Sequence, residues 1–173
     1  MDLTGKKVAV LVEDLYQDLE VWYPLYRLRE AGVTAFTVGS GSKNMYVSRH
    51  GYQCPADKSI KEINVNEIDG IVIPGGYAPD ILRRYPEVNQ LVQDAGHQGK
   101  IIASICHGAW VLCSTDLLEG RSITCFFAIK DDVINAGATY VDQEVCVDGN
   151  IISSRKPDDL PAFMRETLKA LSK

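Results

Sequence analysis

The sequence lacks several features that would assign it to a common functional class. It has no apolar run of membrane-spanning length and no signal-peptide layout at its amino terminus. Its five cysteines are an odd number and form no CxxC pair, which argues against a disulfide framework or a zinc site. Acidic residues outnumber basic ones, with a net charge of −5, which argues against a broad nucleic-acid surface. We therefore expect a cytoplasmic protein without membrane or nucleic-acid partners.

Signals for a metal or a cofactor are also weak. His50 and His97 are too scattered to suggest a metal site. The glycine-rich stretch at residues 39–44 resembles a dinucleotide fingerprint, but Asn44 occupies the place of the third glycine and no clear helix follows. The acids of residues 142–148 alternate with apolar residues, as in a strand and unlike a calcium loop. We expect no metal and no cofactor.

The chain does contain the pattern of an α/β protein, and its 173 residues suffice for one domain, spanning residues 1–173. Buried strands alternate with amphipathic helices throughout, which predicts a mainly parallel sheet covered on both faces. We expect strands near residues 7–12, 33–38, 71–73, 101–105, 122–125 and 144–147, a hairpin arm at 45–56, and helices ending near residue 31 and spanning 86–98 and 157–171. In such sheets, ligands bind beyond the carboxyl ends of the strands.

Cys106 is the most informative residue of the chain. Residues 101–105 read as a buried strand, and the small Gly108 and Ala109 allow the following helix to approach the sheet closely. A cysteine at this turn has the geometry of a nucleophile elbow. The positive end of the helix favours its thiolate form, and we expect the sulfur to be exposed. The other four cysteines are expected to be small buried hydrophobes.

Three further positions are candidates for the same site. Gly75 and Gly76 follow a buried strand directly, so their N–H groups, with that of His107, could bind a developing oxyanion; the alternative is an ordinary tight turn. Glu20 lies early in the first helix and could hold a proton for the thiol or tune its thiolate, or could simply be solvated. His107 could be a general base or a residue that only shapes the local field.

The sequence resembles the PfpI/DJ-1 superfamily, in particular its PfpI-like branch. The resemblance rests on the segments 72–76 (VIPGG), 103–108 (ASICHG), 130–137 (KDDVINAG) and 153–160 (SSRKPDDL), and extends over residues 8–171. It implies a flavodoxin-like three-layer sandwich with Cys106 as nucleophile, Glu20 as the helix carboxyl that contacts the thiol, and His107 as the partner histidine. Members are typically dimers, and PfpI-like members assemble into hexamers, so the resemblance also implies a homo-oligomer.

Three departures from the branch pattern concern the pocket. An acidic residue of a neighbouring subunit can orient the histidine in that branch, and Asp80 holds its place here with a shorter side chain than the usual glutamate. Phe126 stands where a pocket tyrosine is frequent, and so lacks a hydroxyl donor. Trp110 belongs to an Ala-Trp pair in place of Pro-Gln, which predicts a bulkier wall.

The functional prediction is a cofactor-independent cysteine hydrolase or lyase. The resemblance implies intracellular protease, glyoxalase III, deglycase or oxidative-stress activity. We expect Cys106 to attack the carbonyl of methylglyoxal or of a glycation adduct, including glycated protein, with peptides as a further substrate class. The alternative is a redox-sensing stress or chaperone-like protein that oxidises the same cysteine. A glutamine amidotransferase-like domain fits less well, because no histidine follows His107.

Overall fold

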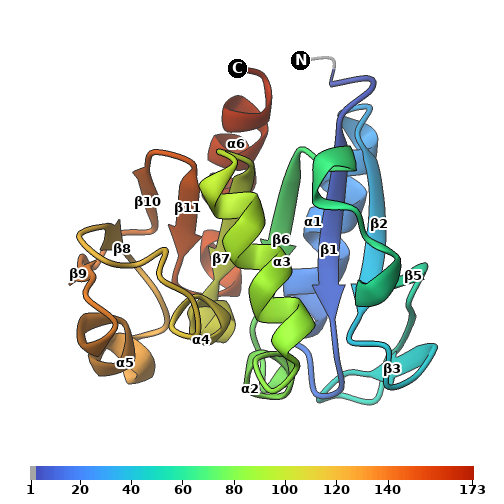
Figure 1. Cartoon of the computed structure of the whole chain (residues 1–173), viewed down its shortest axis with the longest axis horizontal. Helices are drawn as coiled ribbons and strands as arrows, with labels where there is room; N and C mark the ends of the chain where they lie inside the picture. The colour runs from blue at the N-terminus through green and yellow to red at the C-terminus, as the bar shows by residue number, and fades with distance from the viewer. Residues whose placement is uncertain (1–2) are drawn as a thin grey trace.

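The computed structural model describes residues 3–173 and has a central seven-stranded sheet (Figure 1). Its strands lie in the order β10-β11-β7-β6-β1-β2-β5, and all neighbours are parallel except β10 and β11. The strands of this sheet are β1 (Lys7–Val12), β2 (Thr34–Gly39), β5 (Lys58–Ser59), β6 (Gly70–Ile73), β7 (Ile101–Ile105), β10 (Val145–Asp148) and β11 (Ile151–Ser154). The predicted mainly parallel, flavodoxin-like sheet is therefore confirmed.

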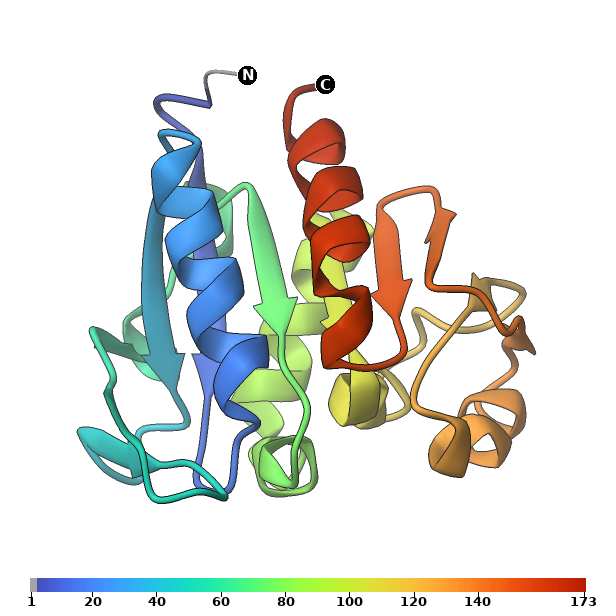
Figure 2. The same ribbon diagram turned by 180° about the vertical axis from the view of Figure 1, so that it is seen from behind.

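Helices cover both faces of the sheet, which makes three layers (Figures 1 and 2). The helices α1 and α6 lie on one face, and α3 lies on the other with the shorter helices α2 and α4 near its end (Figures 1 and 2). The α-helices are α1 (Asp18–Glu30), α2 (Ala78–Leu82), α3 (Pro86–His97), α4 (Ala109–Leu112), α5 (Lys130–Asn135) and α6 (Leu160–Leu171). Short 3-10 turns are η1 (Ile60–Glu62), η2 (Val65–Glu67), η3 (Cys106–Gly108), η4 (Phe127–Ile129) and η5 (Pro157–Asp159).

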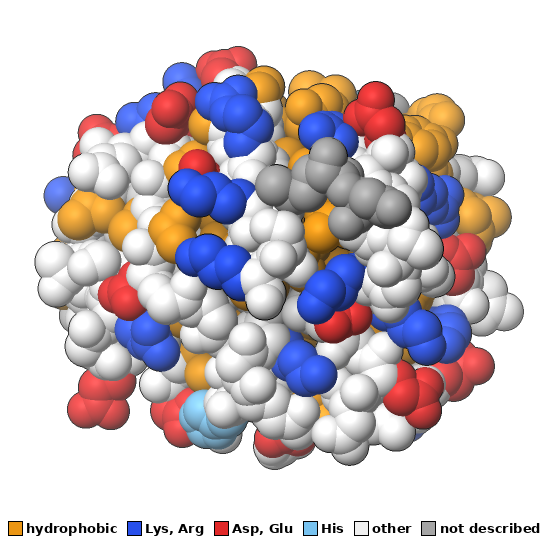
Figure 3. Space-filling view, turned by 90° about the horizontal axis from the view of Figure 1, so that it is seen from above, with side chains coloured by type: hydrophobic (Ala, Val, Ile, Leu, Met, Phe, Trp, Pro, Cys, Tyr) orange, Lys and Arg blue, Asp and Glu red, His pale blue; other side chains and the backbone are white. Residues whose placement is uncertain are grey.

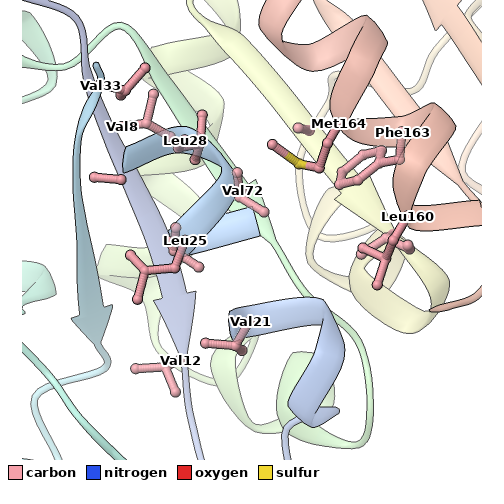
Figure 4. Packing of buried hydrophobic residues seen from close by; sticks show 14 of the residues in the cluster. Val8, Val12, Val21, Leu25, Leu28, Val33, Val72, Leu160, Phe163 and Met164 are labelled. Carbon is pink, nitrogen blue, oxygen red and sulfur yellow. The ribbon is translucent and has the colours of Figure 1, made fainter. Parts of the chain in front are cut away.

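The core forms where the helices bury their apolar stripes on the central strands. Between the sheet and the helices α1 and α6, side chains from β1 and β6 meet side chains from both helices (Figure 4). The residues at this contact include Val8, Val12, Val72, Val21, Leu25, Leu28, Leu160, Phe163 and Met164. Burying each such side chain stabilises the fold by about 1.5–3 kcal/mol. This packing holds the amino-terminal half of α1 against the carboxyl ends of β1 and β6.

Two local features differ from, or refine, the expectations. The segment 122–125 forms only the two-residue strand β8 (Ser122–Ile123), which pairs with β9 (Thr139–Tyr140) outside the main sheet. The helix after Cys106 is also short, because η3 leads into a four-residue α4. The predicted hairpin arm is present as β3 (Met45–Val47) and β4 (Gln53–Pro55).

The two ends of the sheet differ in character. Figure 3 views the end that carries the chain termini, where lysine and arginine side chains are scattered among acidic and neutral ones. A cavity of about 480 Å³ at this end is lined in part by Lys6, Lys100 and Lys169. It contains neither Cys106 nor any other cysteine.

No helix among residues 3–173 is long and apolar enough to cross a membrane.

Candidate active site

The candidate site lies at the carboxyl ends of three adjacent strands. The strand β1 has β2 on one side and β6 on the other. The chain leaves β1 toward β2 and leaves β6 toward β7, so these two connections run in opposite directions from the β1–β6 pair. This is the switch point at which open parallel sheets bind ligands. The segment after Val12, the Gly75-Gly76 turn after β6, and Cys106 after β7 meet at this place.

The turn at Cys106 has the geometry of a nucleophile elbow, as the sequence predicts. Cys106 has a φ of 60°, in the left-handed region that non-glycine residues adopt at a cost of about 1–3 kcal/mol. The strain aims the side chain away from the strand direction and into the switch point. The side chain is not exposed as expected, because only 8% of the residue is accessible to solvent. The segments after β1 and β6 cover it.

Backbone amides surround the sulfur. The N–H groups of Gly76 and His107 donate to Cys106 Sγ and lower the pKa of the thiol. The N–H of Gly75 instead donates to Glu20 Oε2, at 2.7 Å. Of the three amides predicted to bind an oxyanion, those of Gly76 and His107 therefore face the sulfur, and that of Gly75 positions the carboxyl group.

Gly75 is a position where any side chain would disturb the site. A Cβ there would lie 2.6 Å from Glu20 Oε2, 2.8 Å from Cys106 Cβ and 2.9 Å from His107 N. We expect Gly75→Ala to lower the free energy of unfolding by about 1–3 kcal/mol, because overpacking forces these groups apart. Urea unfolding measures this effect, and the rate of Cys106 alkylation should change with it. Gly99→Ala is a suitable control for surface glycines, since nothing lies within 4 Å of its Cβ position and its own positive φ costs backbone strain only. An unchanged alkylation rate in Gly75→Ala would contradict this account of the site.

Glu20 is a buried carboxyl group and not a solvated helix residue. It is 0% exposed, and burial raises its pKa from an ordinary value of 4.5 to about 8, although the Gly75 amide, the Cys106 side chain and Arg49 each lower that pKa. Its Oε1 atom has no hydrogen-bond partner among the described residues. At neutral pH the group is therefore mostly a neutral acid with a proton available beside the sulfur.

The pKa of the Cys106 thiol is raised, whereas the sequence predicted a lowered one. Burial raises the pKa of the thiol, and the negative charge of ionised Glu20 raises it further, against the lowering effect of the two amides. The short α4 adds little macrodipole, which explains why the expected helix effect does not dominate. The resting sulfur is accordingly a thiol. While the Glu20 carboxyl is protonated, it carries no charge and does not add to the raised pKa of Cys106.

His107 lies beside the sulfur and has aromatic neighbours on two sides. Its Nδ1 atom is 3.3 Å from Cys106 Sγ. The imidazole stacks on Phe126 and meets Trp110 edge-on, with ring centroids 4.9 Å apart in both pairs. Burial lowers the pKa of His107, and the nearby Arg49 lowers it further, while Asp132 raises it. The imidazole is thus mainly neutral at pH 7 and can accept a proton.

A cavity of about 280 Å³ opens onto this arrangement, lined by Leu15, Arg49, Gly76, Tyr77, His107 and Trp110. Trp110 is held in the wall by a hydrogen bond from its Nε1 to Asp132 Oδ2, at 3.0 Å. Phe126 lies behind His107 and is not part of the lining. Trp110 thus forms part of the wall, whereas Phe126 supports the imidazole.

Asp80 does not contact His107 within this chain. Its carboxylate pairs with Arg84 one turn further along the same stretch. A role in orienting the imidazole would require Asp80 of a second copy, so the expected triad stays a prediction.

The sequence analysis missed Leu15, Arg49 and Tyr77 as lining residues. Leu15 has a φ of 64°, so a second strained non-glycine residue faces the site. Its carbonyl accepts from Tyr77 N at 2.9 Å, which joins the segments after β1 and β6. A leucine in a left-handed conformation leaves no sequence signal, and Arg49 lies on a hairpin whose docking is decided by tertiary contacts. Among residues 3–173, no group of three or more His, Cys, Asp or Glu side chains could hold a metal ion.

A cysteine on a strained strand-to-helix turn, beside a buried acid and a neutral imidazole, defines an α/β protein of the cysteine-elbow class. The chain belongs to the DJ-1/PfpI family, because the sequence model of that family matches residues 6–170. The family expected from the sequence is therefore confirmed.

Relatives agree with this assignment over nearly the whole chain. A deglycase of Thermococcus kodakarensis is 43% identical over 95% of this chain and 99% of its own. A Bacillus subtilis protein named as a candidate cysteine protease is 40% identical over 96% and 99% of the two chains. The fold matches a two-domain Anabaena variabilis crystal structure, with DJ-1/ThiJ/PfpI-like and ferritin-like domains, at a TM-score of 0.94 and 43% identity over 96% of this chain and 48% of that one.

Proposed function

We propose that this protein is a cofactor-independent cysteine hydrolase or lyase that attacks small carbonyl compounds through Cys106. The observation that carries the proposal is the grouping of the Cys106 thiol with the buried acid Glu20, the imidazole of His107 and two backbone amides, beside a cavity that Gly76 and His107 line. These groups supply a nucleophile, an acid, a base and oxyanion donors within contact of each other.

The opposite pKa shifts of the two titratable partners suggest their roles. Glu20, whose pKa is raised to about 8, begins as an acid and cannot accept a second proton near neutral pH. His107, whose pKa is lowered, is neutral, and its Nδ1 is 3.3 Å from the sulfur. We therefore assign His107 as the base that takes the thiol proton and Glu20 as the acid that protonates the carbonyl oxygen.

The chemistry balances without an added oxidant. The sulfur bonds to the aldehyde carbon of a 2-oxoaldehyde as the thiol proton passes to His107, and the carbonyl oxygen takes a proton from Glu20 to give a hemithioacetal. Transfer of a proton from that carbon to its neighbour, through an enediol, gives a 2-hydroxy thioester. Water then breaks the carbon–sulfur bond and releases a 2-hydroxy acid, while the sulfur regains its proton from His107 and Glu20 regains a proton from the water. One carbon is oxidised and its neighbour is reduced.

Small carbonyl substrates fit the cavity better than peptides do. A volume of about 280 Å³ accommodates methylglyoxal or the end of a glycated side chain, but little of an extended peptide. The deglycase name of the Thermococcus kodakarensis relative supports the same substrate class, and glycated protein is then a macromolecular substrate. Peptide hydrolysis, which the name of the Bacillus subtilis relative suggests, is the second candidate activity.

A redox sensor that uses the same cysteine is less well supported. Oxidation to a sulfenic acid proceeds through the thiolate and is fastest at exposed, low-pKa cysteines. Cys106 is 8% exposed, and burial raises the pKa of its thiol.

We further propose that the protein acts as a homo-oligomer. Large apolar side chains remain exposed on α1, including Leu19 at 55% and Tyr26 at 58%, and in the cavity lining, where Leu15 is 45% and Tyr77 is 48% exposed. A second copy that covered them would also bring residues of another chain near the site, as the proposed role of Asp80 requires.

Turnover of methylglyoxal tests the proposed function. The purified protein, with no cofactor added, should convert methylglyoxal to lactate in proportion to enzyme concentration, as followed by loss of the dicarbonyl and by chiral analysis of lactate. A casein or peptide assay run in parallel tests the second activity. No turnover in either assay, together with selective mass gain at Cys106 under mild peroxide, would favour the sensor and refute the enzyme.

A further inference from the structure

Arg49 is an unpaired cation in the lining of the cavity beside Cys106, among the residues that the structure describes. It lies in the connection between β3 and β4, is exposed, and shares the lining with His107 and Trp110. Its guanidinium takes part in no ion pair and no side-chain hydrogen bond with another residue of the described chain. Its five N–H donors are therefore available to a ligand in the cavity.

The backbone around Arg49 is fixed to the start of α1. Arg49 N donates to Tyr16 O at 3.1 Å, in the segment that also contacts the Gly75-Gly76 turn. On either side, Ser48 Oγ donates to Asp18 Oδ1 at 2.7 Å, and His50 Nδ1 lies 2.6 Å from Asp18 Oδ2. The helix that carries Glu20 thus also holds the loop that carries Arg49, so the backbone of Arg49 has a set position relative to Cys106.

Arg49 also dominates the charge of the cavity. It lowers the pKa of both Glu20 and His107, so its field reaches the two proton-transfer groups. With Glu20 mostly protonated and His107 mostly neutral at pH 7, Arg49 is the charged group of the lining, within a chain of net charge −5. The nearest acid behind the wall, Asp132, accepts a hydrogen bond from Trp110.

We propose that Arg49 binds a carboxylate of the substrate, and that the preferred substrates are carbonyl compounds that carry a carboxylate near the reacting carbonyl. This inference rests on the proposed function of Cys106 and specifies its substrate class. A guanidinium binds a carboxylate through two parallel N–H···O bonds, which would turn the carbonyl end of the substrate toward the sulfur. Neutral 2-oxoaldehydes lack this contact.

A matched pair of substrates separates the two classes. The anionic compound 4,5-dioxopentanoate and the neutral 2-oxopentanal have the same five-carbon chain and the same oxoaldehyde group. Addition of one water gives 2-hydroxyglutarate from the first and 2-hydroxypentanoate from the second. We expect wild type to prefer the anionic substrate by at least tenfold in kcat/KM, and Arg49→Gln to lose that preference mainly through KM. Arg49→Lys should keep part of it, because the charge remains.

Arg27→Gln is the matched control. Arg27 lies on α1, pairs with Glu30 at 3.2 Å and is outside the cavity lining, so the variant makes the same change in net charge. It should keep the wild-type substrate preference. Equal preference in wild type and Arg49→Gln, or an equal loss in Arg27→Gln, would overturn the proposed role of Arg49.

Alkylation of Cys106 tests Arg49 independently of turnover. Iodoacetate is anionic and iodoacetamide is neutral; each forms an S–C bond at the sulfur and releases iodide and the thiol proton. The ratio of their rates at Cys106, followed by peptide mass spectrometry, should fall at least fivefold in Arg49→Gln and stay unchanged in Arg27→Gln. If neither oxoaldehyde is turned over but this ratio falls, the proposed function fails while the anion site stands. An unchanged ratio, or a Cys106 that reacts with neither reagent, refutes the anion site.

Discussion

Replacing Cys106 by serine should lower methylglyoxal turnover by at least 10³-fold, equivalent to about 4 kcal/mol of transition-state stabilisation. A serine hydroxyl is harder to ionise and less nucleophilic than a thiol, and His107 is a weak base whose pKa is lowered further by burial. The serine keeps the backbone of the elbow, so the fold should survive. Steady-state lactate formation at saturating methylglyoxal measures the change.

Cys113→Ser is the matched control for this substitution. Cys113 is partly buried and lies at the carboxyl end of α4, so its variant should keep turnover within about twofold of wild type. Wild-type turnover in Cys106→Ser would remove the nucleophile from the mechanism and, with it, the proposed function. A comparable loss in both variants would point to a general loss of structure, which circular dichroism would detect.

Replacing Glu20 by glutamine should remove the loss of stability that alkaline pH causes through this group. The pKa of Glu20 is about 8 in the folded chain and 4.5 ordinarily, so between these values the folded state holds a proton that the unfolded state has lost. The contribution of this group to the free energy of unfolding is full below pH 4.5. It falls by up to about 1.4 kcal/mol per pH unit and is gone above pH 8. The total loss is about 5 kcal/mol, which is 3.5 pKa units at about 1.4 kcal/mol each.

Glutamine has no such titration. Its carbonyl can still accept from Gly75 N, so Glu20→Gln should be about as stable as wild type near pH 5 and more stable above pH 8. Urea unfolding at pH 5, 7 and 9 measures the slopes. The same variant should turn over methylglyoxal about 10²-fold more slowly, because it cannot protonate the carbonyl oxygen. Glu166→Gln, a change on the outer face of α6, should keep the wild-type slope; an identical slope in Glu20→Gln would show that Glu20 is ionised in the folded state.

The position of the cysteine elbow could be predicted because it depends on local sequence. A buried five-residue strand, a cysteine and the small Gly108 specify a strand-to-helix turn without reference to the rest of the chain. A Cβ on Gly108 would lie 2.3 Å from Ile73 O, so close contact with β6 requires glycine there. The alternation of strands and helices predicts the parallel sheet for a similar reason, since each element buries its own apolar face.

The electrostatics of the site could not be predicted in the same way. The expected low pKa of Cys106 followed from a local rule about helix ends, whereas the raised pKa follows from burial by segments far away in the sequence. Glu20 and Gly75 are separated by 55 residues, yet their 2.7 Å hydrogen bond decides which amides remain for an oxyanion. Arg49 reaches the cavity through a hairpin that is fastened by Asp18.

The amino-acid sequence by itself determined the α/β fold, the family, and the elbow that places a cysteine at a sheet edge, because apolar periodicity and small residues act over a few neighbouring positions. Only the tertiary structure decided that the thiol is buried, that Glu20 is an acid near neutral pH, and that an arginine faces the same cavity. Those properties depend on solvent exclusion and on charges brought together from distant segments, and both arise only when the layers pack.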